Sequence, residues 1–183
     1  MNFIKIRKLF GNYLLKKEIS RLQRNKRAFN MSEAKTFTIL FEASKLEDVD
    51  LVKKYVVYLK EMKKKVRVVG FFNTPYPPDF TYSKLEYEFF SMKELTWYLA
   101  PAGVFVKNFL EEEFDVLIDL NLDDHFPLKY ISTLSRSCFK VGKYSEENEK
   151  VYDLLIDFES GKNFKFFLRQ VDIYLDMINK KVS

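Results

Sequence analysis

The fold is decided by residues 114–158, FDVLIDLNLDDHFPLKYISTLSRSCFKVGKYSEENEKVYDLLIDF. Three apolar runs in this segment have the composition of buried strands, at 114–120, 138–142 and 151–158. A helix is predicted between the first two, from about Pro127 to Arg136, because a proline in the first helical turn loses no hydrogen bond. Apolar strands that alternate with helices indicate an α/β fold with a parallel sheet.

The preceding part of the chain shows the same alternation. TFTILFE, 36–42, predicts a strand, 46–64 predict an amphipathic helix, and KVRVVGFFN, 65–73, predicts the next buried strand. Together they form a βαβ unit, which is normally right-handed and parallel. Further elements are expected as an edge strand at 85–91, a short helix capped by Ser91 and Glu94 that runs through Trp97, and helices at 102–112 and 161–180. We therefore predict a mostly parallel, Rossmann-like three-layer sheet, with 31–183 as a single α/β domain.

The N-terminal 30 residues carry most of the positive charge. They contain nine lysines and arginines against Glu18 alone, a side-chain charge of +8, which leaves −3 for the rest of a chain whose total is +5. Apolar residues at helical spacing predict an amphipathic basic arm over residues 1–30: Phe3, Ile6, Leu9, Phe10, Tyr13 and Leu14. The candidate partner-binding residues of this arm are Lys5, Arg7, Lys8, Lys16, Lys17, Arg21, Arg24, Lys26 and Arg27.

Three interpretations of the arm compete. In the first, the apolar stripe docks on the globular domain and the basic residues form a solvated face. In the second, the lysines and arginines neutralise the phosphates of ribosomal RNA or another nucleic acid. In the third, the arm lies on an anionic membrane surface with Phe3, Ile6 and Phe10 inserted at the headgroup boundary. No apolar run is long enough to cross a bilayer, and the charged N-terminus is unlike a signal peptide, so we expect a cytoplasmic protein.

Polar residues follow several predicted strands, where open α/β sheets bind their ligands. The candidate crevice residues are Glu42, Asn73, Asp119, Asn121, Asp123, Asp124 and His125. Carboxylates that converge at such an edge could hold a divalent cation or act as acid and base. The interpretation we favour is that these acids cap helices or face solvent, with Asp123 or Asp124 capping the helix that starts near Pro127.

Several chemistries common in this fold class lack their motifs. The chain has five glycines and neither G-x-G-x-x-G nor G-x-x-x-x-G-K-[ST], so no nucleotide cofactor is predicted. One histidine cannot build a multi-histidine zinc site, and no G-x-S-x-G elbow is present. We therefore predict no catalytic residue and no metal site. The turn at 141–150, VGKYSEENEK, contains Lys143 but is interpreted as a solvated connection.

The same residues carry two resemblances. With its basic arm, ILFEAS, VGFFN, DLNLDDHFPLKYISTLSRSCFKVGKYSEEN and YDLLID, the whole chain resembles an uncharacterised family of short bacterial proteins, a domain of unknown function, which implies no activity. FDVLIDL, the helix with SxLSRS, and FKVGKY are similar to the N-terminal half of heptosyltransferase-like glycosyltransferases. Such enzymes bind the nucleotide-sugar donor chiefly in a second α/β domain that this sequence lacks, so the resemblance implies the fold without transferase activity.

The leading hypothesis is a non-enzymatic α/β domain that associates through its basic arm with an anionic partner, ribosomal RNA or another nucleic acid ahead of a membrane surface. The competing hypothesis is a small enzyme or ligand-binding protein that uses the acidic crevice around Asp119.

Overall fold

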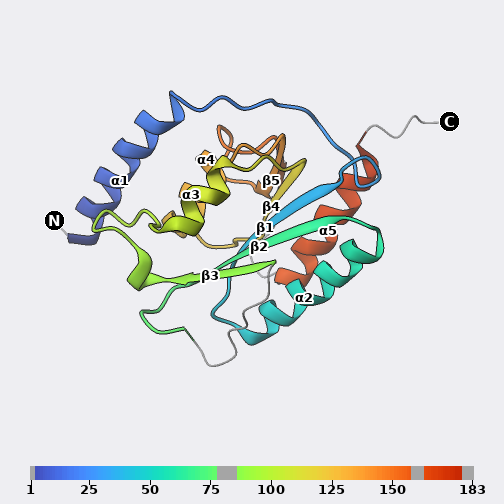
Figure 1. Ribbon diagram of the computed structural model, residues 1–183, viewed down its shortest axis with the longest axis horizontal. Coiled ribbons are helices and arrows are strands. Elements are labelled where there is room, and N and C mark those ends of the chain that lie inside the picture. The colour runs from blue at the N-terminus through green and yellow to red at the C-terminus, as the bar shows by residue number, and fades with distance from the viewer. Residues whose placement is uncertain (1–2, 78–85, 158–162, 179–183) are drawn as a thin grey trace.

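The computed structural model describes residues 3–77, 86–157 and 163–178. Its centre is a sheet of six parallel strands, in the order β3-β2-β1-β4-β5-β6 (Figure 1). The strands are β1 Thr36–Glu42, β2 Lys65–Phe72, β3 Tyr87–Ser91, β4 Val116–Asp119, β5 Phe139–Lys143 and β6 Leu154–Ile156. This confirms the predicted Rossmann-like α/β sheet, and every pairing in it is parallel.

The strand order reverses between β1 and β4, as it does in doubly wound folds. Phe37 of β1 pairs with Val66 of β2 on one side and with Val116 of β4 on the other. Because β1 is central and covered on both faces, it is apolar along almost its whole length and does not alternate. The ligand-binding edge of such a sheet lies where β1, β4 and β5 end.

Helices cover both faces of the sheet. α2 Leu46–Glu61 and α5 Phe164–Met177 bury Val52, Leu59 and Phe167 against one face. α3 Val104–Glu111 and α4 Phe126–Leu134 bury Phe109 and Ile131 against the other. The two clusters form the core on either side of the strands, which gives the predicted three layers (Figure 1).

An additional helix, α1 Phe3–Ile19, packs on the outer side of α4. Leu15 is buried there together with Phe126, Tyr130 and Leu134. Gly11 makes the approach possible, since a Cβ at this position would lie 2.5 Å from the carbonyl oxygen of Tyr98 and 2.8 Å from the Phe126 ring. The N-terminal arm is therefore docked on the α/β domain.

Local details differ from the sequence prediction at more than one place, and the strand predicted at 151–158 is the shorter β6 Leu154–Ile156. The capping box of Ser91 and Glu94 forms, but the element it starts is a single 3-10 turn, η1 Met92–Glu94, and not a helix through Trp97. Leu95 instead bridges to Pro101, and Leu99 takes a positive φ of 68°. Within the described residues, no helix has the length and apolar composition required to cross a bilayer.

Candidate functional site

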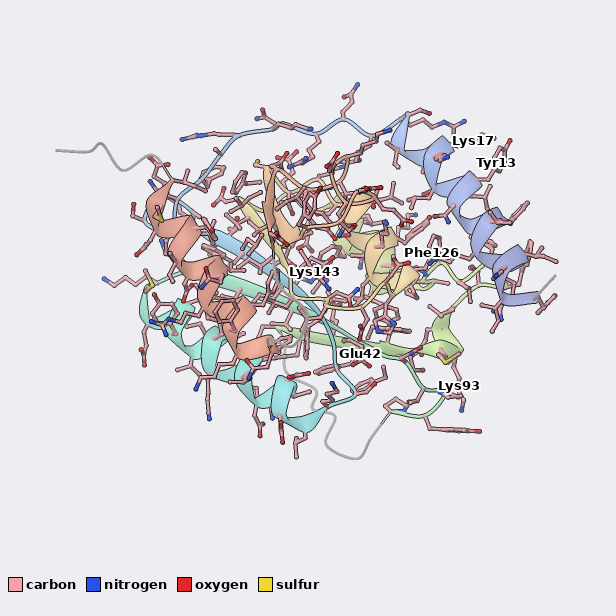
Figure 2. The ribbon with its side chains drawn as sticks, turned by 180° about the vertical axis from the view of Figure 1, so that it is seen from behind. Tyr13, Lys17, Glu42, Lys93, Phe126 and Lys143 are labelled. Atoms are coloured by element: carbon pink, nitrogen blue, oxygen red, sulfur yellow. The ribbon has the colours of Figure 1, made fainter. Side chains whose placement is uncertain are left out.

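A cleft of about 530 Å³ opens at the carboxyl ends of β4 and β5. One wall is the loop after β4, with Asn121, Asp123 and Asp124, and the other is the segment 143–148 after β5. This is the edge at which parallel α/β sheets bind ligands, and the volume suits a small molecule. Figure 2 labels Lys143, the last residue of β5, and Glu42, the last residue of β1, which lies on the other side of β4.

Asp119, the last residue of β4, forms the floor of the cleft and is only 3% exposed. Its Oδ2 accepts a hydrogen bond from the Tyr152 hydroxyl at 2.5 Å, and its Oδ1 accepts one from the Asn121 backbone N–H at 3.0 Å. The Ser132 hydroxyl of α4 lies 3.0 Å from the Tyr152 hydroxyl and 3.1 Å from the Lys129 carbonyl oxygen. A connected polar network thus surrounds one buried carboxylate.

Burial raises the pKa of Asp119 to about 6, although the hydrogen bonds from Tyr152, Asn121 and Ser132 and the charge of Lys129 act in the opposite direction. The pKa of Tyr152 is raised well above its ordinary value, first by burial and then by the Asp119 charge. Tyr152 therefore stays a hydrogen-bond donor to the carboxylate at every physiological pH.

Gly142 of β5 is what lets Tyr152 reach Asp119. A Cβ at residue 142 would lie 2.7 to 2.9 Å from three atoms of the Tyr152 ring. The ring therefore lies directly against the strand, and its hydroxyl is directed to the end of β4. This glycine serves close packing and has no positive φ.

The cationic groups of the cleft are already engaged by the protein. Lys129 Nζ pairs with Glu147 at 2.9 Å, and Lys143 Nζ donates to the Leu122 carbonyl oxygen at 2.9 Å. On the rim, Lys8 of α1 pairs with Asp124. Burial by itself would raise the pKa of Asp124, but this ion pair and nearby Lys129 lower it.

Asn121 contributes an acceptor that the protein leaves unused. Its Oδ1 is buried and has no hydrogen-bond partner among the described residues. A buried acceptor without a partner costs about 1 to 3 kcal/mol, so such atoms are rare unless something outside the chain satisfies them. In the described part of the chain, no group of three or more His, Cys, Asp or Glu side chains is arranged to hold a metal ion.

A second feature is the outer face of α1, which we define as Phe3, Ile6, Leu9, Phe10 and Tyr13. Their exposed fractions range from 39% for Ile6 to 69% for Phe3. In Figure 2, Tyr13 and Lys17 project from the side of α1 that faces away from the domain, whereas Phe126 lies on its inner side. Trp97, 56% exposed, extends this surface, since its ring centroid is 4.7 Å from that of Phe10.

This arrangement corrects one sequence interpretation. Most of the predicted apolar stripe does not dock on the domain, because Phe3, Ile6, Leu9 and Tyr13 are exposed. Phe10 is 40% exposed and contacts the rings of Trp97 and Tyr98. The opposite side of α1 docks on the domain through the buried residues Gly11 and Leu15. The Tyr130 hydroxyl also donates a hydrogen bond to Glu18 at 2.7 Å. The face chosen is the one that allows the closest approach to α4, not the one with most apolar side chains.

A family model matches residues 7–178, and its description is "Family of unknown function (DUF6913)". This chain belongs to the DUF6913 family. The match spans nearly the full length and confirms the predicted membership of an uncharacterised family. No curated protein and no solved structure matches the chain, so DUF6913 membership brings no activity, ligand or partner with it, and the heptosyltransferase resemblance stays a prediction.

The predicted crevice residues of the DUF6913 chain separate into two groups. Asp119, Asn121, Asp123 and Asp124 line the cleft. The other three lie outside it: Glu42 accepts hydrogen bonds from Ser44, Asn73 is exposed after β2, and the His125 ring packs 5.9 Å from that of Phe71. The prediction that Asp123 or Asp124 caps α4 is wrong, because its N-cap is His125 and no side chain makes a capping hydrogen bond.

The sequence interpretation missed the second wall of the cleft. Residues 143–148 belong to a turn interpreted as a solvated connection, and Tyr152 was expected in a strand at 151–158, yet all of them line the cavity opposite Asn121. Gly142 and Tyr152, ten residues apart, are both visible in the sequence. That the ring of Tyr152 packs on Gly142 can be seen only in the folded chain.

The basic residues of the arm are also divided by the structure. Arg24 is used internally: its side chain is 7% exposed, donates to the carbonyl oxygens of Ser137 and Cys138, and pairs with Asp153. Lys8 pairs with Asp124, and Arg7 donates to the carbonyl oxygen of Trp97. The exposed basic residues of the arm are Lys5, Lys16, Lys17, Arg21, Lys26 and Arg27.

Proposed function

We propose that the protein is a peripheral membrane-surface protein, held on an anionic bilayer by the outer face of α1. The supporting observation is that the five apolar side chains of this face are exposed on a helix that also exposes Lys5, Lys16 and Lys17. A helix with this composition lies in the interface plane, with its apolar side chains in the headgroup boundary. Removal of this apolar area from water contributes about 25 cal/mol per Å².

The charge distribution favours the same partner. Lys16 and Lys17 follow Tyr13 by three and four residues, so they border the outer face of α1, and Lys5 stands one turn before Leu9. Each lysine or arginine near an anionic leaflet contributes about 1 kcal/mol. The one acid in α1, Glu18, accepts a hydrogen bond from Tyr130 on the inner side of the helix.

Nucleic acid, the partner placed first by charge alone, is the second candidate. The phosphates of a nucleic acid would attract the same lysines, but binding to phosphates would not remove the exposed side chains of Leu9 and Ile6 from water. Three of the nine basic residues that supported it are paired with acids of the protein itself, namely Lys8, Arg24 and Lys26. The exposed apolar residues are therefore the observation that favours the membrane.

Flotation with vesicles tests the proposal. Vesicles of phosphatidylcholine mixed with phosphatidylserine are expected to carry the protein, and vesicles of phosphatidylcholine alone to carry much less. The variant Phe3→Glu/Leu9→Glu removes apolar area at two positions that are at least 64% exposed, and Lys16→Gln/Lys17→Gln removes charge. Both are expected to abolish flotation while the thermal unfolding temperature stays unchanged.

Matched controls come from the opposite side of the sheet. Val57→Glu places the same charge on an exposed apolar site of α2, and Lys45→Gln/Lys54→Gln removes two exposed lysines there. Both should float like the unaltered protein. If single-stranded RNA binds instead, and this binding depends on Lys16 and Lys17 but not on Phe3 and Leu9, the partner is nucleic acid and the membrane proposal fails.

A further inference from the structure

The cleft at the end of β4 has the dimensions and position of a ligand site and is separate from the outer face of α1. Its volume of about 530 Å³ lies within the range of small-molecule sites, which is about 300 to 1,000 Å³. Both walls and the floor come from ordered elements or short turns, since Asp119 ends β4, Lys143 ends β5 and Lys129 belongs to α4. A small molecule would thus find a preformed cavity.

The groups available inside the cleft are mainly hydrogen-bond acceptors. Five carboxylates line it, those of Asp119, Asp123, Asp124, Glu146 and Glu147, against the two lysines 129 and 143, and of the five Asp124 and Glu147 are ion-paired with Lys8 and Lys129. Both lysines already contact acceptors of the protein. The buried Oδ1 of Asn121 has no donor among the described residues. What is missing from this cavity is therefore a molecule that supplies donors and positive charge.

We propose that the cleft binds a small organic cation, whose ammonium or guanidinium group lies against Asp119 and donates to Asn121 Oδ1. Charge-assisted hydrogen bonds hold the cation in this site. Such bonds are stronger in a cleft with little water than at the protein surface, because the local dielectric constant is lower. The ligand also satisfies Asn121 Oδ1, a buried acceptor that has no partner among the described residues.

Two other observations support a ligand at this place. The buried carboxyl of Asp119 has its pKa raised to about 6, so at neutral pH the fold keeps a charge that burial disfavours. The network of Tyr152 and Ser132 fixes the position of this carboxylate and is itself held in place by the contact of Tyr152 with Gly142. An anionic ligand is disfavoured, because it would meet the carboxylates while both lysines are engaged.

Isothermal titration calorimetry with four probes tests this inference. Agmatine and glucosamine carry the cationic groups, glucose is the neutral match of glucosamine, and glucose 6-phosphate is the anionic match. We expect at least one of the two cations to bind with one site per chain, and glucose and glucose 6-phosphate to give no heat above dilution. Vesicles are absent from the experiment, so its result does not depend on the membrane proposal.

Two variants connect the binding to the cleft. Asp119→Asn is expected to weaken the cation about ten- to a hundredfold, since a hydrogen bond to a charged group is lost. Asn121→Ala breaks no hydrogen bond of its side-chain oxygen, and it should weaken binding of the cation about tenfold without lowering the unfolding temperature. Asp50→Asn, which removes an exposed acid of α2, is the control and should bind normally.

The outcomes are exclusive. Cation binding that both cleft variants weaken, and Asp50→Asn does not, supports the inference. Binding that survives both cleft variants, preference for glucose or glucose 6-phosphate, or absence of binding by both cations at millimolar concentration would overturn it.

Discussion

Replacement of Asp119 by asparagine is expected to stabilise the protein at neutral pH. The carboxyl has a pKa of about 6 in the folded state against an ordinary value of 3.8, a difference that corresponds to about 3 kcal/mol. Between pH 4 and pH 6 the folded protein holds this proton while the unfolded chain releases it, so the carboxyl's contribution to stability falls as the pH rises through this window. Above pH 6 the whole cost of the buried charge remains.

Asparagine mimics the protonated acid and keeps the network intact. Its oxygen accepts from the Asn121 N–H, and its amide donates to Tyr152, whose hydroxyl turns toward Ser132. We therefore expect the free energy of unfolding of Asp119→Asn to be about 3 kcal/mol higher than that of the unaltered protein at pH 7.5, which corresponds to roughly 6 to 12 °C in unfolding temperature. Near pH 4 the two proteins should be equally stable. Urea titrations at both pH values measure the difference.

The control for this experiment is Asp123→Asn, which removes an exposed acid from the same cleft. It should change stability by less than about 0.5 kcal/mol at either pH. If Asp119→Asn is less stable than the unaltered protein at pH 7.5, or if the difference is the same at pH 4 and pH 7.5, the carboxylate is not destabilised by burial and the reasoning is wrong.

Three further predictions concern the contacts that hold the arm and the cleft in place. Arg24→Ala leaves Asp153 without its buried partner and should cost about 3 to 5 kcal/mol in urea unfolding, whereas a loss below 1 kcal/mol would mean that the ion pair is solvated. Gly142→Ala pushes the Tyr152 ring off β5 and should cost about 1 to 3 kcal/mol, with a changed near-ultraviolet circular dichroism spectrum; an unaltered spectrum would contradict the close packing. Tyr130→Phe removes the hydrogen bond that ties the end of α1 to α4, so it should cost about 1 kcal/mol and accelerate amide exchange in the last turn of α1, and unchanged exchange there would argue against this tether.

The strands could be predicted from sequence because burial on both faces leaves a simple pattern. TFTILFE was expected as a strand at 36–42, and β1 has those bounds. Asp119 could likewise be placed at the ligand-binding edge, since it ends an apolar run and parallel strands bring their carboxyl ends together. Both inferences depend only on local composition and on the parallel arrangement, which the alternation with helices already indicates.

The second wall of the cleft could not be predicted in this way. Lys143 and Tyr152 face Asp119 because the segment after β5 folds back over the strand, and this depends on packing between residues distant from β4 in the sequence. The orientation of α1 was undecidable for a similar reason. The helix has apolar residues on two sides, and the side that docks is set by the close approach at Gly11.

Two features of the protein act against its own stability or solubility, and the fold requires neither. A leucine, two phenylalanines, an isoleucine and a tyrosine are exposed on α1, although Gly11 and Leu15 already dock the helix without them. A carboxylate is buried at Asp119, although an amide would fit the same hydrogen bonds. Natural sequences depart from local rules of this kind mainly where another molecule binds. The ion pair between Lys8 and Asp124 joins these two features directly, because it links α1 to the rim of the cleft. If the proposed ligand binds, a shift of α1 that breaks this ion pair would change the charge at the rim of the cleft, and by thermodynamic reciprocity the ligand would then favour one position of α1.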